Sequence, residues 1–360
     1  MPSAPLPRVS VIMPARNAER WIGEALASAL SQDDVQLEVV VVDDASSDRT
    51  VALAEQHGAS VRCLRQATTH GAAVARNTAI AHARGDLLAF LDADDRFLPG
   101  KLAQQVAFLD AHPDVGLVHT GWDFIDETGR RIGTGWSPVQ GDVAHALLLG
   151  ESIHPLSAVV RRAPVVALGA FDETLPALED WDLFLRLALR GMRWGRIAAP
   201  LCEYRVHPGQ SHRRAALKHT TRLHILTRTF DDPAFPPALA GSRAEVFQRA
   251  YLRATVEMLD AGLPADAQRA FVEAVRARPE VLAEPGVYRS LARLLMPTGR
   301  QSQAHAAREW LGVTRTLGSL VEHAVREADM PSRLRWAARW NVLRTGARLL
   351  RKRVSAAVSP

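Results

Sequence analysis

The first hundred residues alternate between short apolar runs and stretches of helical periodicity, and this order restricts the fold more than any other feature. Apolar runs of strand length are followed by amphipathic stretches that carry helix stop signals such as Gly58 and Gly85. Strands are expected at 9–13, 37–42, 61–64 and 87–91, and helices at 19–32, 49–57 and 72–83. Such β-α-β order predicts a mainly parallel sheet with helices on both faces. Ligands of such sheets bind beyond the carboxyl ends of the strands.

The order loosens after Asp95, and beyond about Ser211 the pattern is helical. Residues 1–212 hold 19 Lys and Arg against 26 Asp and Glu, whereas residues 213–360 hold 25 against 13. The net charges are −7 and +12, which suggests two modules, although a solvated arginine-rich surface gives the same count. We expect an α/β domain at 1–212, an α-helical domain at 213–330 and a basic amphipathic helix at 331–360.

The helical half contains a faint repeat. Tyr251 and Tyr288 lie 37 residues apart, as do Ala267 and Ala304. The run Ala267, Phe271, Ala274 and Pro279 matches the second helix of a tetratricopeptide-type hairpin. An unrelated helical hairpin fits this short match equally well.

The last thirty residues hold eight Lys and Arg and no acid. A helical wheel places an apolar stripe between arginines, and its members are Trp336, Trp340, Leu343, Ala347, Leu350 and Val354. Tryptophan and leucine flanked by arginine are typical of an interfacial membrane helix. The alternative is a terminal helix that packs this stripe on the protein's own helical domain.

Composition excludes several classes. Two cysteines, Cys63 and Cys202, are too few for a disulfide framework or a zinc site and fit a reducing cytosol. No run approaches the roughly 20 apolar residues of a membrane span, and Val9–Met13 is too brief for a signal peptide. The sequence lacks the Gly-x-Gly-x-x-Gly, P-loop and His-Glu-x-x-His patterns. No zinc motif or aromatic-interleaved strand supports nucleic-acid binding.

Polar clusters follow three of the expected strands. They are Pro14-Ala15-Arg16-Asn17, Asp43 to Asp48, and Asp92-Ala93-Asp94-Asp95. Alternate residues of an extended segment share a face, so Asp92 and Asp94 can aim at one point. Close carboxylates repel unless a cation or proton neutralises them. Mg²⁺ or Mn²⁺ bound by carboxylates and substrate phosphates is the expected solution, and a solvated acidic turn is the alternative.

The order of these motifs resembles family 2 glycosyltransferases, the inverting enzymes of GT-A fold. The similar segments are Val-Ser-Val-Ile-Met-Pro-Ala-Arg-Asn (9–17), Val-Val-Val-Val-Asp-Asp-Ala-Ser-Ser-Asp (39–48), Gly71 with Ala75-Arg76-Asn77, and Phe-Leu-Asp-Ala-Asp-Asp (90–95). Further on, Gly-Ala-Phe-Asp-Glu (169–173), Glu-Asp-Trp-Asp (179–182) and Tyr-Arg-Val-His-Pro-Gly (204–209) are similar to the family's acceptor-side and closing segments. The resemblance covers about residues 7–212.

The resemblance implies a role for each matching residue. The nucleotide pocket would be lined by Pro14, Ala15, Asn17, Asp43 and Asp44, with Arg76 near the donor's phosphates or sugar. Asp92 and Asp94 would form the metal and ribose motif, with Asp95 adjacent. Arg205 and His207 would close over the diphosphate, and His207 is counted among the metal ligands. One position departs from the family: Arg16 stands where an aromatic residue is usual. A guanidinium can also stack on a base, but the departure weakens the argument that the base is uracil.

On the acceptor side the resemblance makes Asp180 the catalytic base, with Glu179 and Trp181 beside it. Inverting displacement at an anomeric carbon needs a carboxylate to take the acceptor proton. It also needs a cation for the departing diphosphate. In isolation, Glu179-Asp180 at the start of a helix would more often be a cap that suits the helix dipole.

The function expected is inverting transfer of a sugar from a nucleotide-diphosphate sugar, UDP-linked, to a glycan or lipid-linked acceptor in bacterial surface polysaccharide or glycoconjugate assembly. The pathway is implied by the resemblance alone. The expected location is the cytoplasm, peripheral on the inner face of the plasma membrane. The rival is a non-catalytic scaffold or nucleotide-sugar-binding protein of the same fold that recruits partners through its helical half.

Overall fold

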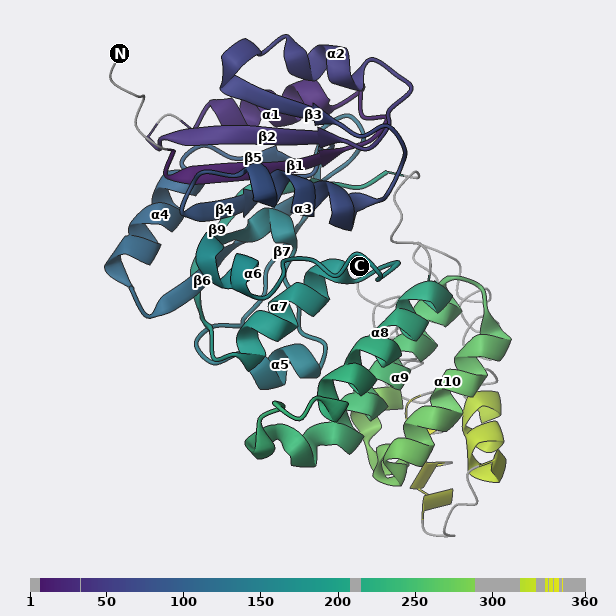
Figure 1. The fold of residues 1–360 in the computed structure, drawn as a ribbon. Coiled ribbons are helices and arrows are strands. Elements are labelled where there is room, and N and C mark those ends of the chain that lie inside the picture. The colour runs from purple at the N-terminus through teal and green to yellow at the C-terminus, as the bar shows by residue number, and fades with distance from the viewer. Residues whose placement is uncertain are drawn as a thin grey trace, which may run out of the picture. The chain divides into compact units, whose positions relative to one another are not determined.

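The computed structural model describes residues 7–32, 34–207, 215–288, 318–327, 334–335, 337–338, 340–342 and 345. The chain divides into two compact units, Met1–Gln210 and Ser211–Pro360. Figure 1 shows the α/β unit from purple to teal and the helical unit in green.

The first unit contains a nine-stranded sheet and seven α-helices among the described residues. Its strands are β1 Val9–Ala15, β2 Leu37–Asp43, β3 Val61–Arg65, β4 Leu87–Phe90, β5 Arg96–Phe97, β6 Val115–Ile125, β7 Arg131–Gly135, β8 Ala158–Arg161 and β9 Arg193–Arg205. Its α-helices are α1 Ile22–Leu30, α2 Thr50–Glu55, α3 Ala72–His82, α4 Lys101–Ala111, α5 Ala144–Leu148, α6 Arg162–Ala167 and α7 Glu179–Leu189. Short 3₁₀ turns are η1 Gly58–Ser60 and η2 Pro155–Ser157.

The sheet has the strand order β3-β2-β1-β4-β8-β6-β9-β5, and β7 pairs with β6. The pairs among β1, β2, β3 and β4 are parallel. The pairs β4–β8, β6–β8, β6–β7 and β5–β9 are antiparallel, and β6–β9 is parallel. The expectation of a mainly parallel sheet holds for the N-terminal half only, and the whole sheet is mixed.

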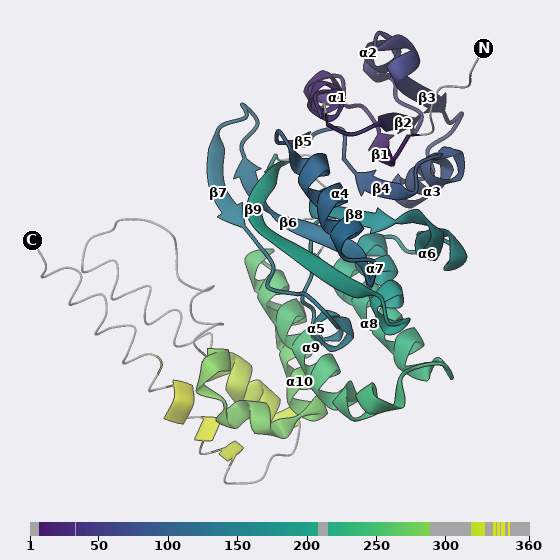
Figure 2. The same cartoon turned by 90° about the vertical axis from the view of Figure 1, so that its left-hand side faces the viewer.

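Helices cover both faces of the N-terminal half, as Figure 2 shows for α1 and α3. Val9, Val11 and Met13 of β1 belong to one core cluster with α1 residues Ile22 and Leu26. The intervening Ile12 is also fully buried. Burial on both sides explains why β1 and β2 are apolar over most of their length rather than alternating. The carboxyl ends of β1, β2 and β4 consequently meet at one edge of the sheet.

The second unit is helical in its described residues. Its elements are α8 Ala215–Asp231, η4 Pro237–Ser242, α9 Arg243–Asp260, α10 Pro264–Ala277 and η5 Pro279–Ala283. Ala267, Phe271 and Ala274 of α10 are fully buried, as a tetratricopeptide-type helix requires. The second copy of the proposed repeat, at Ala304, lies outside the described residues, so the repeat stays a prediction.

Most of the basic segment 331–360 also lies outside the described residues. The described positions Ala338 and Val342 pack in a core cluster with Phe271, whereas Trp340 is 51% exposed. Trp340 is therefore not on the buried face, and the other members of the predicted apolar stripe lie outside the described residues. Among the described residues, no helix combines the length and apolarity needed to cross a bilayer.

Candidate active site

The segments after β1 and β2 are tied together at the carboxyl edge of the sheet. The Asn17 backbone N–H donates to Ser46 Oγ at 2.9 Å, and the Ser47 N–H donates to Asn17 Oδ1 at 2.9 Å. Asn17 and Ala45 have φ of 47° and 56°, in the left-handed region. Such a conformation in Ala45 is strained and persists only where the surroundings enforce it. The loops after β1 and β2 are therefore held together as one rigid surface at the carboxyl edge of the sheet, where the sequence predicts both of them.

The two aspartates after β2 are both buried. Asp43 Oδ2 accepts from the Ser46 N–H at 3.0 Å, and its Oδ1 has no hydrogen-bond partner among the described residues. Asp44 accepts from Thr69 Oγ1 at 2.8 Å and from the N–H groups of His70 and Gly71 at 2.7 and 3.0 Å. Burial opposes ionisation of Asp44, but these hydrogen bonds lower its pKa overall. Asp44 thus fixes the segment that leads into α3.

Pro14 and Ala15 supply backbone to the same surface. The Asp44 N–H donates to the Ala15 carbonyl oxygen at 2.8 Å. Pro14 is partly buried and Ala15 is buried, whereas Arg16 is exposed. These expected pocket-lining residues therefore lie together with Asn17, Asp43 and Asp44.

Arg76 of α3 connects two motifs that lie far apart in the sequence. Its side chain is 6% exposed and its guanidinium donates to Asp92 Oδ1 at 2.8 Å and to Glu179 Oε1 at 2.9 Å. Burial alone would lower its pKa, but Asp92 and Glu179 raise the pKa overall. The sequence-based expectation placed Arg76 against the donor's phosphates or sugar. The structure instead buries it between two carboxylates, because an unpaired guanidinium there would be costly.

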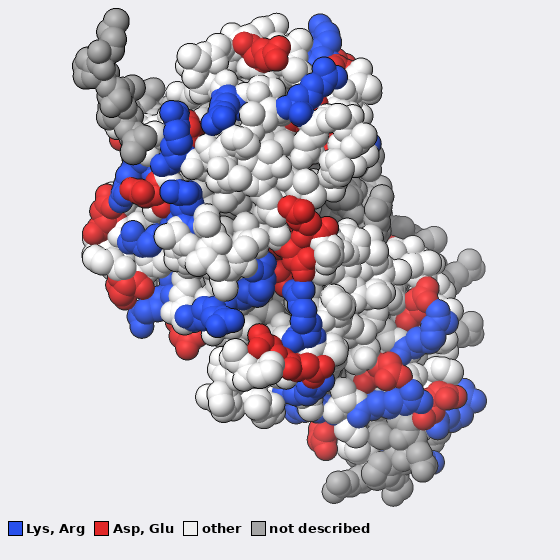
Figure 3. Space-filling model, in the orientation of Figure 1, with Lys and Arg blue, Asp and Glu red and all other residues white. Residues whose placement is uncertain are grey.

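Asn77, the next residue on α3, fixes the loop before α7. Its amide nitrogen donates to the Phe171 carbonyl at 2.9 Å and to Glu173 Oε1 at 2.8 Å, and its Oδ1 accepts from the Phe171 N–H at 2.9 Å. The Phe171 ring lies 5.5 Å from the Arg76 guanidinium carbon. The Ala-Arg-Asn segment of α3 and the Ala-Phe-Asp-Glu segment before α7 are therefore in direct contact in the folded chain. Figure 3 shows acidic side chains gathered over the part of the unit where α3 and α7 lie.

The segment after β4 carries three carboxylates in different surroundings. The Asp92 and Asp94 side chains are 40% and 25% exposed, whereas Asp95 is buried. Burial and the charge of Asp92 raise the pKa of Asp94, although a hydrogen bond with His207 opposes the rise. Burial and both neighbouring aspartates raise the pKa of Asp95 well above its ordinary value. This excess of negative charge is what a cation would relieve.

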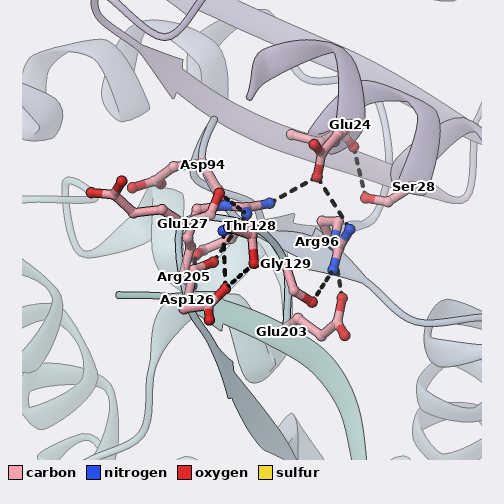
Figure 4. Close-up of polar contacts among 12 residues, drawn as sticks. Glu24, Ser28, Asp94, Arg96, Asp126, Glu127, Thr128, Gly129, Glu203 and Arg205 are labelled. Atoms are coloured by element: carbon pink, nitrogen blue, oxygen red, sulfur yellow. Dashed lines mark hydrogen bonds and ion pairs between the residues drawn. The ribbon is translucent and has the colours of Figure 1, made fainter. Parts of the chain in front are cut away.

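Arg205, at the end of β9, is buried beneath this segment. Its N–H donates to Asp95 Oδ1 at 2.8 Å, its Nε to the Asp94 carbonyl at 2.8 Å and its Nη2 to Glu24 of α1 at 2.8 Å. Figure 4 shows Arg205 surrounded by Glu24, Asp94 and the hairpin 126–129. Both Arg205 and Asp95 are therefore internal supports. Their expected contact with the donor stays a prediction.

His207 remains at the surface of the site. Its Nε2 lies 2.9 Å from Asp94 Oδ2, and its ring centroid lies 4.6 Å from that of Trp21. Trp21 and Glu24 were not among the sequence-predicted site residues. They appeared only as part of an amphipathic helix, and nothing in the pattern showed that β9 ends beside them.

Asp180 lies in the first turn of α7, next to the Arg76 network. Its side chain is partly exposed, and burial together with Glu179 raises its pKa to about 6, although Arg76 opposes the rise. A carboxylate with such a pKa is ionised at neutral pH and still accepts a proton readily. Trp181 is 5% exposed and its Nε1 donates to the Leu147 carbonyl at 3.1 Å. Trp181 is therefore packed in the core beside Asp180, and its expected role on the acceptor side stays a prediction.

The donor set partly fits the expected metal. Asp92 and Asp94 offer carboxylate oxygens and His207 an imidazole nitrogen, which suit Mn²⁺ or Mg²⁺. Within the described residues no three His, Cys, Asp or Glu side chains are placed to hold a metal by themselves. A cation here would need further ligands, as expected for metals that bind with substrate phosphates.

Part of the first unit matches a known protein family. Residues 10–155 match the model of the glycosyl transferase family 2. The matched segment contains the strand-end clusters, Arg76 and the three aspartates after β4. The acceptor-side motifs at 169–182 and the closing segment at 204–209 lie beyond it.

Relatives of the first unit are named as a putative glycosyltransferase and as a succinoglycan biosynthesis protein. EpsE of Bacillus subtilis is 39% identical over 129 residues, which cover 35% of this chain and 46% of the relative. The succinoglycan biosynthesis protein ExoU of Rhizobium meliloti is 35% identical over 203 residues, 52% of this chain and 58% of the relative. The chain thus spans about half the length of the curated relatives it matches.

Two solved structures share the fold over most of the chain. TarS 1–349 of S. aureus, in complex with UDP, has a TM-score of 0.59 at 20% identity and covers 90% of this chain and 93% of that chain. The mannosyltransferase PcManGT of Pyrobaculum calidifontis, in complex with GDP-Man and Mn²⁺, has a TM-score of 0.55 at 23% identity and covers 90% and 88%. The expected GT-A fold followed by a helical region is confirmed.

Proposed function

We propose that the protein is a hexosyltransferase-type glycosyltransferase that transfers a sugar, with inversion, from a nucleotide-diphosphate sugar to an acceptor hydroxyl. The family match over residues 10–155 and the named relatives support the transferase class. The rest of the proposal depends on the geometry around Arg76.

The observation that carries the proposal is the double pairing of Arg76 with Asp92 and Glu179, at 2.8 and 2.9 Å. It brings the Asp-x-Asp segment after β4 next to the start of α7, where Asp180 has its raised pKa. A diphosphate site and a basic carboxylate at one edge of a sheet are the two groups that glycosyl transfer requires. A binding scaffold has no use for a carboxylate tuned in this way.

The transfer step makes one bond to the anomeric carbon and breaks another. The acceptor hydroxyl oxygen forms a bond to the anomeric carbon while Asp180 takes the hydroxyl proton. The bond between the anomeric carbon and the diphosphate oxygen breaks on the opposite face, and its electron pair leaves with the nucleoside diphosphate. Attack from the face opposite the leaving group inverts the anomeric configuration. Glu179, held by Arg76, orients the first turn of α7.

Asp92, Asp94 and His207 are the residues that would hold a divalent Mn²⁺ or Mg²⁺ ion. When bound, such an ion supplies charge to the diphosphate as a Lewis acid. A complex of PcManGT with GDP-Man and Mn²⁺ supports this role by analogy of fold.

The donor is proposed to be a UDP-sugar, which the UDP complex of TarS supports. Asn17, Asp43 and Asp44 would face the nucleoside, and exposed Arg16 would stack on the base. Asp43 Oδ1 is a buried acceptor without a partner among the described residues, and a nucleoside N–H or O–H would pair with it only after the loop that follows β2 shifts.

The proposed setting is bacterial surface polysaccharide or glycoconjugate assembly, with a glycan or lipid-linked acceptor. The names of two relatives support it: the succinoglycan biosynthesis protein ExoU and the O-antigen biosynthesis protein RfbC of Myxococcus xanthus. We place the protein in the cytoplasm, peripheral on the membrane. Free thiols at Cys63 and Cys202 and the exposed Trp340 support this placement.

The test is release of nucleoside diphosphate from a panel of UDP- and GDP-sugars, with Mn²⁺ or with EDTA. The proposal expects Mn²⁺-dependent release from at least one donor, and loss of that release in Asp94→Asn. A protein that binds these donors with Mn²⁺ but never releases product would instead be the scaffold.

A further inference from the structure

We propose that a small pocket beside β7 binds one sugar unit of the acceptor glycan, away from the transfer site. This rests on the proposed function. The pocket has a volume of about 280 Å³, near the lower end of the usual range for small-molecule sites. Its walls come from β6, β9, the end of β7 and the loop after it, including Gly121, Trp136, Ser137 and Arg196. All lie within the first unit.

The most exposed large apolar side chain among the described residues is in this pocket. Trp136 is 65% exposed, and the Arg196 guanidinium carbon lies 5.8 Å from its ring centroid. An indole at a pocket rim, with its polar edge in water, suits a ligand that has an apolar face and polar edges. The C–H face of a pyranose ring and its hydroxyls have this character.

Two buried polar groups in the pocket walls have no hydrogen-bond partner among the described residues. Ser137 is 3% exposed and its Oγ is unpaired, and so is Nε of Arg196. Buried polar groups are normally satisfied, so each unpaired one points to a missing partner. Both atoms are sealed from solvent in this structure, so a hydroxyl-bearing ligand pairs with them only after the Ser137 and Arg196 side chains turn toward the pocket. A hydrocarbon chain can pair with neither.

Glycines fix the floor of the pocket. A Cβ on Gly135 would come within 2.3 Å of Trp122 Nε1, and a Cβ on Gly121 within 3.2 Å of the Gly135 carbonyl oxygen. Small residues therefore let β6, β7 and β9 approach closely beside the pocket.

The strand that carries the pocket begins near the candidate active site. The carbonyls of Asp126 and Glu127, in the hairpin before β7, each accept from Arg205 at 3.3 Å. β7 then runs about 13 Å from Arg131 to Gly135. It lies at the outside of the sheet in Figure 2 and pairs only with β6 among the described strands. An acceptor chain of several sugars could follow this strand from the transfer site to Trp136.

The experiment measures binding of gluco-, galacto-, manno- and N-acetylglucosamine oligosaccharides of one to six units by calorimetry. We expect at least one oligosaccharide to bind the full chain. Trp136→Ala should weaken it about tenfold or more through loss of aromatic contact. Ala198→Trp, which fills the pocket from an exposed position, should weaken it similarly. Ile132→Ala is the matched control, since Ile132 is an exposed apolar residue of β7 outside the pocket.

Three results would overturn the proposal: no binding by any oligosaccharide, binding unaffected by both pocket variants, or equal loss in Ile132→Ala. Light scattering tests the alternative that a second copy of this chain covers the pocket. A dimer that Trp136→Ala dissociates would show that this face is a dimer interface. UDP binding with Mn²⁺ is measured in parallel. Failure of the nucleotide site is therefore distinguishable from failure of this pocket.

Discussion

Arg76 forms ion pairs with two carboxylates within 3 Å. Because Arg76 is buried, solvent screens these ion pairs only weakly, and its charge affects the electrostatics of both motifs. Asp92 belongs to the segment proposed to face the diphosphate, and Glu179 precedes the proposed base. The charge of Arg76 also lowers the pKa of Asp180 against the opposite effects of burial and Glu179. One guanidinium therefore sets both the position and the proton affinity of the acidic groups.

Replacing Arg76 tests this coupling. Arg76→Met leaves Asp92 and Glu179 without their partner, which should reduce the unfolding free energy by about 3–5 kcal/mol. It also removes a charge that lowers the pKa of Asp180, so the acid limb of the pH–rate profile should move to higher pH. Thermal unfolding and kcat/KM against pH provide the measurements. Arg76→Lys keeps the charge and should shift the profile less. Unchanged stability and profile in Arg76→Met would contradict the assignment.

The sequence predicted which residues lie together at this edge of the sheet but not how deeply each of them is buried. Asn17, Asp44, Asp92 and Asp94 lie at the expected edge because parallel strands end there, which follows from the alternation of elements alone. Burial of Asp95, Trp181 and Arg205 depends on partners distant in the chain, such as Glu24 for Arg205. A sequence motif singles out a residue, but it does not show whether that residue contacts the substrate or holds another residue that contacts it.

At the scale of elements, the N-terminal half of the sheet is predictable and β9 is not. The runs of β1, β2 and β4 are recognisable as strands because they are buried on both faces, whereas β3 is partly exposed. β9 was missed: its sequence contains Gly195 and Pro200, which weaken strands locally. Pairing with β6 accommodates them through register shifts, at positions that include Gly121 opposite Pro200. Only the long-range partner makes this segment a strand.

A pair of glycines tests the packing of α3 and β4 against β1. A Cβ on Gly85 would lie 2.7 Å from the Ser10 backbone nitrogen, so Gly85→Ala should destabilise by about 1–3 kcal/mol. A Cβ on Gly23 in α1 would meet no atom within 4 Å, so Gly23→Ala should stabilise by about 0.4–1 kcal/mol. Denaturant unfolding gives both values. Equal effects of the two substitutions would contradict the close approach at Gly85.

At the scale of the whole molecule, the acidic first half and the basic second half suggest different partners. The second unit is the part proposed to meet anionic lipid. Within its described C-terminal residues, Ala338 and Val342 face a core cluster and Trp340 faces outward. Removal of the entire segment would therefore disturb the fold as well as any membrane contact, and point substitutions separate the two effects.

Trp340→Ser and Val342→Ser make that separation. Trp340→Ser should weaken sedimentation with anionic vesicles and leave the melting temperature nearly unchanged. Val342→Ser should lower the melting temperature, because it places a hydroxyl in a buried apolar position. Vesicle binding of the unmodified chain should fall with salt, since arginine attraction to anionic lipid is screened. Indifference of the unmodified chain to vesicles would remove the membrane proposal.

The most direct test of the proposed transferase is the kinetics of Asp180→Asn, compared with Asp182→Asn on the same helix. Asp182 is buried and pairs with Arg186 at 2.8 Å, so its replacement should lower stability and leave the pH dependence of transfer in place. Asp180→Asn keeps size and hydrogen bonding but removes basicity. We predict that it lowers kcat about 10²–10⁴-fold, abolishes the acid limb near pH 6 and leaves UDP binding with Mn²⁺ nearly unchanged. Transfer at a near-native rate by Asp180→Asn would contradict this assignment and move the base to another residue.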